Sequence, residues 1–311
     1  MTMPTGLRVR RLAPRVVAAI ILLGATLALG ELTGLPASSA DRTANFVATG
    51  HDMEYHCALG QQCPYFSILV TKVRNGSTLP VLAIAQAGDL PAALTAVSVP
   101  FTPVDPTDPA FATTPFVSPS GAPLFSAIVV NSDDTCGGCD GTAAGITAIN
   151  ARKDDFKAFF NAGGGIFALA GAERRDTYYD FVPLSGLAAA AVSPPFTVTA
   201  EGTALGITDA EANCCPTHNA FANPPDPFVV LESDSAGLAE TIAAFDVVIG
   251  GGGFETTTTT TTTTTAPTTT TSTAPTTTTA TSVAPSTTTP PPPPPPAPPA
   301  VPVGGAADFT G

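Results

Sequence analysis

Hydrophobic and polar residues follow two patterns along the chain. Four short, nearly continuous apolar runs come first, at residues 44–49, 79–85, 125–131 and 166–170. Runs of this kind predict β-strands in a sheet that is covered on both faces. Three later runs lie closer together, at residues 196–200, 228–232 and 242–249, and we expect antiparallel pairing there.

Between the early runs, apolar residues recur every three or four positions, as on one face of an α-helix. The segments with this spacing are residues 64–73, 90–97, 146–160 and 174–181. Pro64 suits the first turn of a helix, and the third segment has a candidate break near Ala151. Residues 50–57 and 101–123 are predicted to be loops, the second with one brief strand.

Strands that alternate with helices predict a parallel sheet with a helix layer on each face. The stretch from Ser126 to Asp180 shows this arrangement most fully, as strand, cysteine loop, amphipathic helix, glycines 163–165 and strand. We therefore expect an α/β fold, a three-layer sandwich with a mainly parallel sheet.

The first 40 residues have the pattern of a secretory signal peptide. Four arginines precede an apolar core at residues 16–29, and the segment ends in the small residues 37–40. An apolar core of this length is short for a membrane span. We expect cleavage before Asp41; an uncleaved N-terminal anchor is the alternative.

The other end of the chain has a composition that cannot form a core. Residues 256–303 are almost only Thr, Pro, Ala and Ser, and no charged residue lies between Glu255 and Asp308. Such a segment is expected to be disordered, with its proline run extended. We predict a folded domain over residues 41–255 and a Thr/Pro-rich stalk over residues 256–311, whose threonines are candidate O-glycan acceptors.

The chain is acidic, with a formal net charge of −13. Outside the predicted signal peptide, 8 Lys and Arg stand against 24 Asp and Glu. This balance argues against nucleic acid as a partner, because phosphates require basic groups. It fits a secreted or cell-wall-associated protein whose partner is an envelope component or an extracellular ligand, and no transmembrane span is expected in the mature chain.

Six cysteines within residues 41–255 predict disulfide bonds in an exported protein. They form three close pairs: Cys57 with Cys63, Cys136 with Cys139, and Cys214 with Cys215. Local pairing is expected for the first two, because each flanks a short polar loop. For the adjacent third pair, a vicinal disulfide and two free or cross-linked thiols are both open.

Polar residues follow the predicted strands at the edge where open α/β sheets bind ligands. All three histidines, His51, His56 and His218, are among them, with Asp52 and Glu54 nearby. Their imidazoles could bind a divalent metal together with either carboxylate, or act as general acid and base. Hydrogen bonds that order the loops are the structural alternative.

The same edge offers other candidates. Cys215 and His218 could be a nucleophile and its base, oriented by Glu173, unless the cysteine is oxidised. The candidate ligand-binding residues are Asp133, Asp134, Arg174, Tyr178 and Asn219. For Tyr178, packing of its helix is the alternative role.

Four segments together carry a resemblance to a known family: GHDMEYHC, AIVVNSDDTCGGC, FNAGGGIFALAGAERRDTYYDFVP and ALGITDAEANCCPTHNAF. The chain resembles exported bacterial proteins of the class I glutamine amidotransferase-like superfamily, nearest to its trehalose-utilisation-type branch. The resemblance spans about residues 44–250 and implies a flavodoxin-like sandwich. In the amidotransferases, a Gly-x-Cys-x-Gly turn after a strand carries the nucleophile. The matching turn here, residues 170–174, has no Cys, Ser or Thr, and Asn219 follows His218 in place of a His-x-Glu pattern.

Amidotransfer is therefore not expected. The sequence favours a secreted or cell-surface domain that binds an envelope component or small ligand without catalysis, displayed on its stalk. The alternative is an exported hydrolase or lyase that acts on a carbohydrate or amide through the histidines and Asp52. The two hypotheses differ in geometry, because a shared catalytic or metal site requires His51 and His218 to converge.

Overall fold

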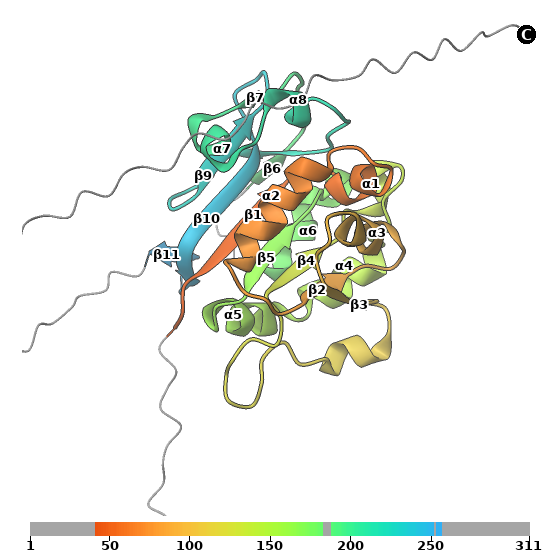
Figure 1. The fold of residues 1–311 in the computed structure, drawn as a ribbon, viewed down its shortest axis with the longest axis vertical. Helices are drawn as coiled ribbons and strands as arrows, with labels where there is room; N and C mark the ends of the chain where they lie inside the picture. Colours follow the sequence, from red (N-terminus) through yellow and green to blue (C-terminus); the bar gives the residue numbers. More distant parts are fainter. Residues whose placement is uncertain (1–40, 183–187, 252, 257–311) are drawn as a thin grey trace, which may run out of the picture. The chain divides into compact units, whose positions relative to one another are not determined.

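The computed structural model describes residues 41–182, 188–251 and 253–256. The predicted signal peptide and residues 257–311 of the predicted stalk lie outside the described residues. The described part is built on one sheet of 11 strands, in the order β3-β2-β4-β5-β1-β10-β8-β6 (Figure 1). Three further strands leave this path, since β11 and β9 pair with β10, and β7 pairs with β9.

One half of the sheet is parallel. Its strands are β3 (Phe101–Val104), β2 (Val81–Ile84), β4 (Ala127–Val130), β5 (Gly165–Ala168) and β1 (Ala44–Thr49). Every pair of neighbours among these five strands runs parallel. Every residue of β1, β2, β4 and β5 is buried, which explains why these strands are continuous apolar runs in the sequence.

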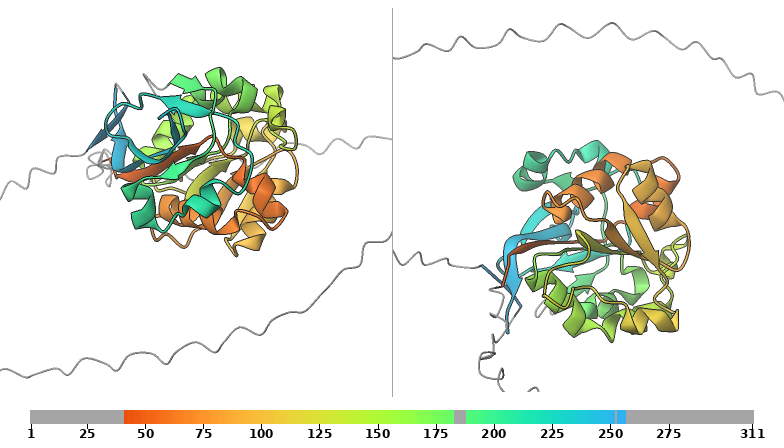
Figure 2. Two further views of the ribbon diagram at one scale, coloured as in Figure 1. Left: turned by 90° about the horizontal axis from the view of Figure 1, so that it is seen from above. Right: turned by 60° about the horizontal axis from the view of Figure 1, so that its bottom comes forward.

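The other half is antiparallel, as the late part of the sequence predicts. Its strands are β6 (Ala188–Ala190), β7 (Thr197–Val198), β8 (Ala220–Ala222), β9 (Val229–Ser233), β10 (Ala239–Ile249) and β11 (Phe254–Thr256). The long β10 lies beside β1 along the whole of that strand (Figure 2). The strand expected at residues 196–200 is reduced to β7, because helix α7 begins at Ala200.

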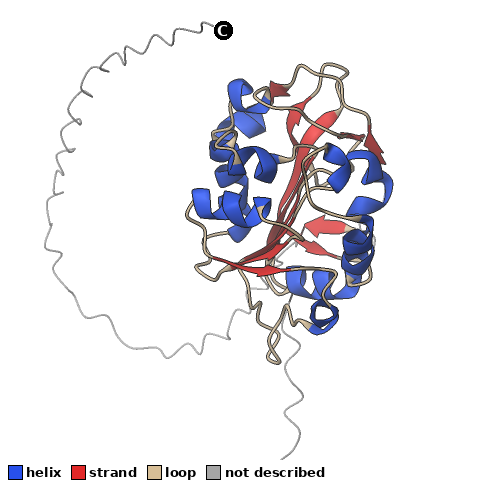
Figure 3. Ribbon diagram, turned by 90° about the vertical axis from the view of Figure 1, so that its right-hand side faces the viewer, coloured by secondary structure: helices blue, strands red, loops and turns tan. Residues whose placement is uncertain are grey.

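Helices cover both faces of the sheet, so the three-layer prediction is confirmed (Figure 3). On one face lie α1 (Met53–Ala58), α2 (Cys63–Arg74), α3 (Asp89–Ala96) and α7 (Ala200–Leu205), with α8 (Asp209–Ala212) against α2 and β7. On the other lie α4 (Ala143–Asn150), α5 (Lys153–Asn161) and α6 (Arg175–Tyr178). Successive residues of β1 alternate between two cores: Phe46 and Ala48 pack with α4 and α5, and Val47 packs with α1, α2 and α3.

The sequence predicts the break between α4 and α5 correctly, but it predicts the segment after β1 only in part. The break near Ala151 is present, because Arg152 is buried between α4 and α5 and donates to the carbonyl oxygen of Phe111 at 2.6 Å. The predicted loop at residues 50–57 is wrong in its second half, which forms α1. Only Met53 and Cys57 in this short helix reach the apolar core, so it has no helical periodicity to detect.

The order of the parallel strands departs from a flavodoxin-like sheet, in which it is 2-1-3-4-5. Here β2, β3, β4 and β5 occupy the places of strands one to four, and β1 occupies the fifth place. The spatial order is thus a circular permutation of the expected one.

Among the described residues, no helix is long and apolar enough to cross a membrane.

Candidate functional site

The carboxyl ends of β1, β4 and β5 meet at one edge, as the sequence predicts for parallel strands. The late loop before β8 joins them there. An isolated antiparallel bridge pairs His51 with Thr217, and the backbone amide of His218 donates to the carbonyl oxygen of Gly50 at 2.9 Å. The loop that carries His51 and the loop that carries His218 therefore lie together, although they come from opposite ends of the domain sequence. They meet because β8, which follows the second loop, pairs with β10, and β10 pairs with β1.

Asp52 is the centre of this edge. Its carboxylate lies between two imidazoles, 3.2 Å from Nε2 of His56 and 3.3 Å from Nε2 of His218. The Asp52 side chain is 3% exposed, and those of His56 and His218 are 9% and 18% exposed. Burial opposes the ionisation of Asp52, but His218 and His56 outweigh it and lower the pKa of Asp52 to about 2. Asp52 in turn raises the pKa of His56, so the site favours a carboxylate beside an imidazolium.

His51 does not share this carboxylate. Its Nε2 lies 2.6 Å from Oε1 of Glu232, and its Nδ1 lies 2.8 Å from the hydroxyl of Thr217. Both ring nitrogens are therefore engaged, and the His51 side chain is fully buried. The hypothesis of one metal site or one acid–base site formed by all three histidines is not supported, because they are divided between Asp52 and Glu232.

The three disulfides are all local. Cys57 is bonded to Cys63, Cys136 to Cys139, and Cys214 to Cys215. Cys214 and Cys215 therefore form the vicinal disulfide, one of the two alternatives that the sequence leaves open. Because Cys215 is in this bond, it has no thiol that could act as a nucleophile. Glu173, the expected orienter, is exposed, and its backbone amide donates to the hydroxyl of Thr135.

One disulfide lies directly against the site. Sγ of Cys139 is 3.6 Å from Oδ2 of Asp52. Across the described ranges, Asp52, Cys136 and Cys139 are the only group of three whose possible metal-ligating atoms lie within 4.8 Å of one another. The sulfur atoms are bonded to each other, so this group does not fit a metal ion while the disulfide is intact.

Glu54 is fully buried behind Asp52. One of its carboxyl oxygens accepts from the backbone amide of Ser132, at the end of β4. Burial is the main cause that raises the pKa of Glu54, to about 8, and the nearby Asp52 adds to it. Glu54 is therefore protonated at neutral pH, which leaves Asp52 as the anionic member of the pair.

After β5 the chain turns sharply at Ala172, whose φ of 45° lies in the left-handed region. Residue 172 is the position that the sequence resemblance matches to the nucleophile of the amidotransferases. The amides of Gly171 and Ala172 both donate to Oδ1 of Asn219, at 2.9 and 3.1 Å. Asn219 is fully buried, so this candidate ligand-binding residue instead holds the turn in place.

Of the remaining ligand-binding candidates, Asp133, Asp134 and Arg174 contact one another, and Tyr178 contacts the backbone after β4. Arg174 forms ion pairs with Asp133, at 2.7 Å, and with Asp134. The hydroxyl of Tyr178 donates to the carbonyl oxygen of Asn131 at 2.7 Å, and its side chain is buried. These contacts fasten α6 and the cysteine loop to the end of β4, which agrees with the packing alternative for Tyr178.

Two buried acids on the antiparallel strands are not among the site residues predicted from the sequence. Glu232 of β9 and Glu240 of β10 are both fully buried. Burial raises the pKa of Glu240 well above its usual value, and Glu232 adds to this effect. The detectable signal was a glutamate near the end of β9 and another near the start of β10, each within an otherwise largely apolar strand.

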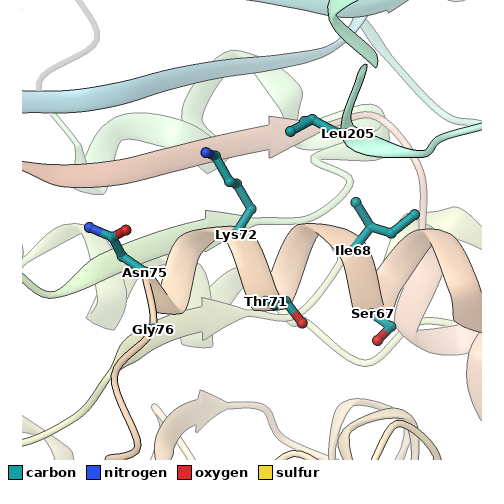
Figure 4. A pocket seen from close by; sticks show the side chains of 7 residues that line it. All are labelled: Ser67, Ile68, Thr71, Lys72, Asn75, Gly76 and Leu205. Atoms are coloured by element: carbon teal, nitrogen blue, oxygen red, sulfur yellow. The ribbon is translucent and has the colours of Figure 1, made fainter. Parts of the chain in front are cut away.

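A separate shallow pocket lies on the outer surface of α2 (Figure 4). Its volume is about 450 Å³, and it is lined by Ser67, Ile68, Thr71, Lys72, Asn75, Gly76 and Leu205. None of these residues is acidic, a histidine or a cysteine. The pocket thus contains none of the groups of the Asp52 site, and we take that site as the candidate functional site.

Comparisons with protein-family models, curated proteins and solved structures found no match.

Proposed function

We propose that the protein is an exported, surface-displayed member of the class I glutamine amidotransferase-like superfamily that has lost amidotransfer. The turn after β5 supports this proposal. Ala172 adopts a left-handed conformation there, the strained geometry of a nucleophile elbow, but its side chain is a methyl group. The side chain at the elbow position therefore offers a potential substrate no nucleophilic atom.

We further propose that the carboxyl edge binds a polar ligand, either a small molecule or a component of the cell envelope. The observation that carries this proposal is a set of buried polar atoms that have no hydrogen-bond partner among the described residues. It comprises Oε2 of Glu54 and Nδ1 of His56, together with Oδ1 of Asp52 and Nε2 of His56 and of His218, which are engaged only in the ion pairs with Asp52 at 3.2 and 3.3 Å. Buried polar groups are normally paired, so their accumulation at one edge favours a ligand with hydroxyl or amide groups.

One observation favours a second candidate, an exported hydrolase or lyase that acts on a carbohydrate or amide. Asp52 is flanked by two imidazoles, and it raises the pKa of His56, which favours the protonated form of that ring. A carboxylate and an imidazolium in contact are a suitable pair for general acid–base catalysis. This candidate uses the same residues as the binding proposal and differs only in whether product forms.

Co-sedimentation of the protein with insoluble cell-wall polymer, followed by analysis of the supernatant for soluble fragments, tests both. We expect binding that His218→Ala weakens at least tenfold. Thr71→Ala, in the pocket of Figure 4, is the matched control and should bind like the wild type. Equal binding by His218→Ala and the wild type would contradict the proposed site, and so would the absence of binding to both the polymer and its soluble fragments. Fragments that accumulate with the wild type and not with His218→Ala would establish the second candidate.

A further inference from the structure

The Cys136–Cys139 disulfide is placed where open α/β sheets carry out their chemistry. It follows β4, between β2 and β5 in the sheet, and both cysteines are half-buried. The two residues are only three positions apart. A ring this small removes less chain entropy from the unfolded state than a long loop would, so it is a weak structural crosslink.

The loop around the disulfide has a fixed conformation. A bridge between Asp133 and Gly141 closes its base. Between the cysteines, Gly137 has a φ of 95°, which favours glycine. A Cβ on Gly138 would lie 2.5 Å from the ring of Tyr55, so a side chain there would force that ring on α1 to shift. The two sulfur atoms are thus presented in a set position against α1.

The two sulfur atoms have different surroundings. The backbone amide of Cys139 points at Sγ of Cys136, at a distance of 2.9 Å. An N–H group in this position would stabilise a thiolate on Cys136. Sγ of Cys139 instead faces the buried carboxylate of Asp52, at 3.6 Å.

His56 and His218 orient the Asp52 carboxylate, and its Oδ2 faces both Nε2 of His218 and Sγ of Cys139. Asp52 occupies the position before α1 where an aspartate commonly caps the helix, yet its side chain makes no capping hydrogen bond. A disulfide offers a carboxylate no proton, whereas a thiol at Cys139 would donate one. The position of Asp52 therefore suits the reduced form of the pair.

From this geometry we propose that Cys136 and Cys139 are a redox-active pair that exchanges with the dithiols and disulfides of polypeptides. Cys136 forms the mixed disulfide, Cys139 resolves it, and Asp52, whose Oδ2 also contacts Nε2 of His218, relays the proton of Cys139 to and from that imidazole. The proposal is independent of the ligand that the histidines bind. The other two disulfides are unsuited to this role, because within the described segments neither has a carboxylate in a comparable cluster with its sulfur atoms.

The steps balance in protons and electrons. A thiolate of a substrate dithiol attacks Sγ of Cys136; the bond between the two cysteines breaks, and its electron pair stays on Cys139. The second substrate thiol gives up its proton, which passes through Asp52 to Cys139, and then attacks the substrate sulfur in the mixed disulfide. Cys136 leaves as a thiolate and takes up the proton that the first substrate thiol released. Two electrons and two protons have moved from substrate to protein, and a disulfide substrate restores the protein by the reverse steps.

Trapping experiments test the assignment of the two cysteines. The reduced Cys139→Ser variant is mixed with a peptide that contains one disulfide, and the adducts are mapped by mass spectrometry. We expect a persistent mixed disulfide on Cys136, and at least tenfold less adduct on Cys139 in the Cys136→Ser variant. Equal trapping by the two variants would overturn the assignment, as would a Cys136–Cys139 bond in the wild type that resists dithiols after Cys57–Cys63 has been reduced.

Asp52→Asn tests the proton acceptor in the wild-type cysteine background. We expect the mixed disulfide to accumulate, resolution to slow at least tenfold, and the pH dependence of the resolution rate to change. Asp134→Asn, on the same loop and paired with Arg174, is the matched control and should resolve at the wild-type rate. An unchanged rate and pH profile in Asp52→Asn would overturn the proposed role of Asp52. If this variant fails to fold, the trapping result still decides the assignment of the two cysteines.

Discussion

Ala172 is held in the left-handed region although it carries a side chain. For a residue with a Cβ this conformation costs about 1 kcal/mol or more relative to glycine, so it persists only where the surroundings enforce it. Here the amides of Gly171 and Ala172 converge on Asn219, and the Tyr179 hydroxyl lies 3.4 Å from the same Asn219 oxygen. The sequence shows that no Cys, Ser or Thr stands at this turn, but the backbone strain depends on Asn219, about fifty residues away, and has no local signal.

Glu54 should make the stability of the protein fall as pH rises. Burial raises the pKa of Glu54 from 4.5 to about 8, so the folded protein keeps a proton that the unfolded chain releases. The stabilisation is complete below pH 4.5 and is lost as pH approaches 8, at up to about 1.4 kcal/mol for each pH unit. Glu54→Gln cannot release a proton, and we expect it to lose less free energy of unfolding between pH 5 and pH 8 than the wild type.

Denaturant unfolding at a series of pH values measures this difference. The exposed Glu173 provides the matched control, and Glu173→Gln should follow the wild-type pH dependence. Parallel curves for Glu54→Gln and the wild type would show that Glu54 is already ionised in the folded protein. Asp52 would then no longer be the only anion of the two.

At the scale of elements, a buried hydrogen-bond network joins β1, β9, β10 and α2. The hydroxyl of Thr241 contacts three side chains, namely those of Tyr65 at 3.0 Å, Thr49 at 2.8 Å and Glu232 at 2.8 Å. Glu232 continues the network to His51. We expect Thr241→Val, which keeps the shape of the side chain, to cost about 1–3 kcal/mol, because it leaves buried polar groups without a partner.

A double-mutant cycle measures this cost in denaturant unfolding. Tyr65→Phe removes a partner hydroxyl, so the double variant should be less destabilised than the sum of the two single variants. Additive effects would mean that the contact between Tyr65 and Thr241 contributes nothing specific to stability. Tyr55→Phe, on α1 and outside the network, should leave the effect of Thr241→Val unchanged.

The elements that the sequence predicts well are those whose signal lies within the element. β1 is predicted at its observed bounds, and α2 begins one residue before Pro64. The short strands β6 and β8 were missed, because they are three residues long and pair mainly with each other and β10. In the site, the approach of His218 to Asp52 can be predicted, because strand ends meet at one edge of the sheet. The contact between His51 and Glu232 cannot, because it depends on the register of β9 on β10.

For the whole molecule, the antiparallel half is an integral part of the fold. β10 is 11 residues long and mostly buried, and it pairs with β1 over the full length of that strand. Its residues Ile242 and Ala244 enter one core, and Ala243 enters the other. Without β10, the central parallel strands would end in an open edge that is apolar on both faces, the kind of edge that leads to aggregation.

We therefore expect a chain that ends after Pro225, and so lacks β9, β10 and β11, to aggregate or remain unfolded. A chain that ends after Thr256 keeps all three strands and should unfold cooperatively, with the midpoint of the full-length protein. Size-exclusion chromatography and far-UV circular dichroism measure the two outcomes. Cooperative unfolding of the shorter chain would show that the five parallel strands form an independent unit. It would also remove the structural basis for His218 reaching Asp52, because the loop that carries His218 is held in place by β10 through β8.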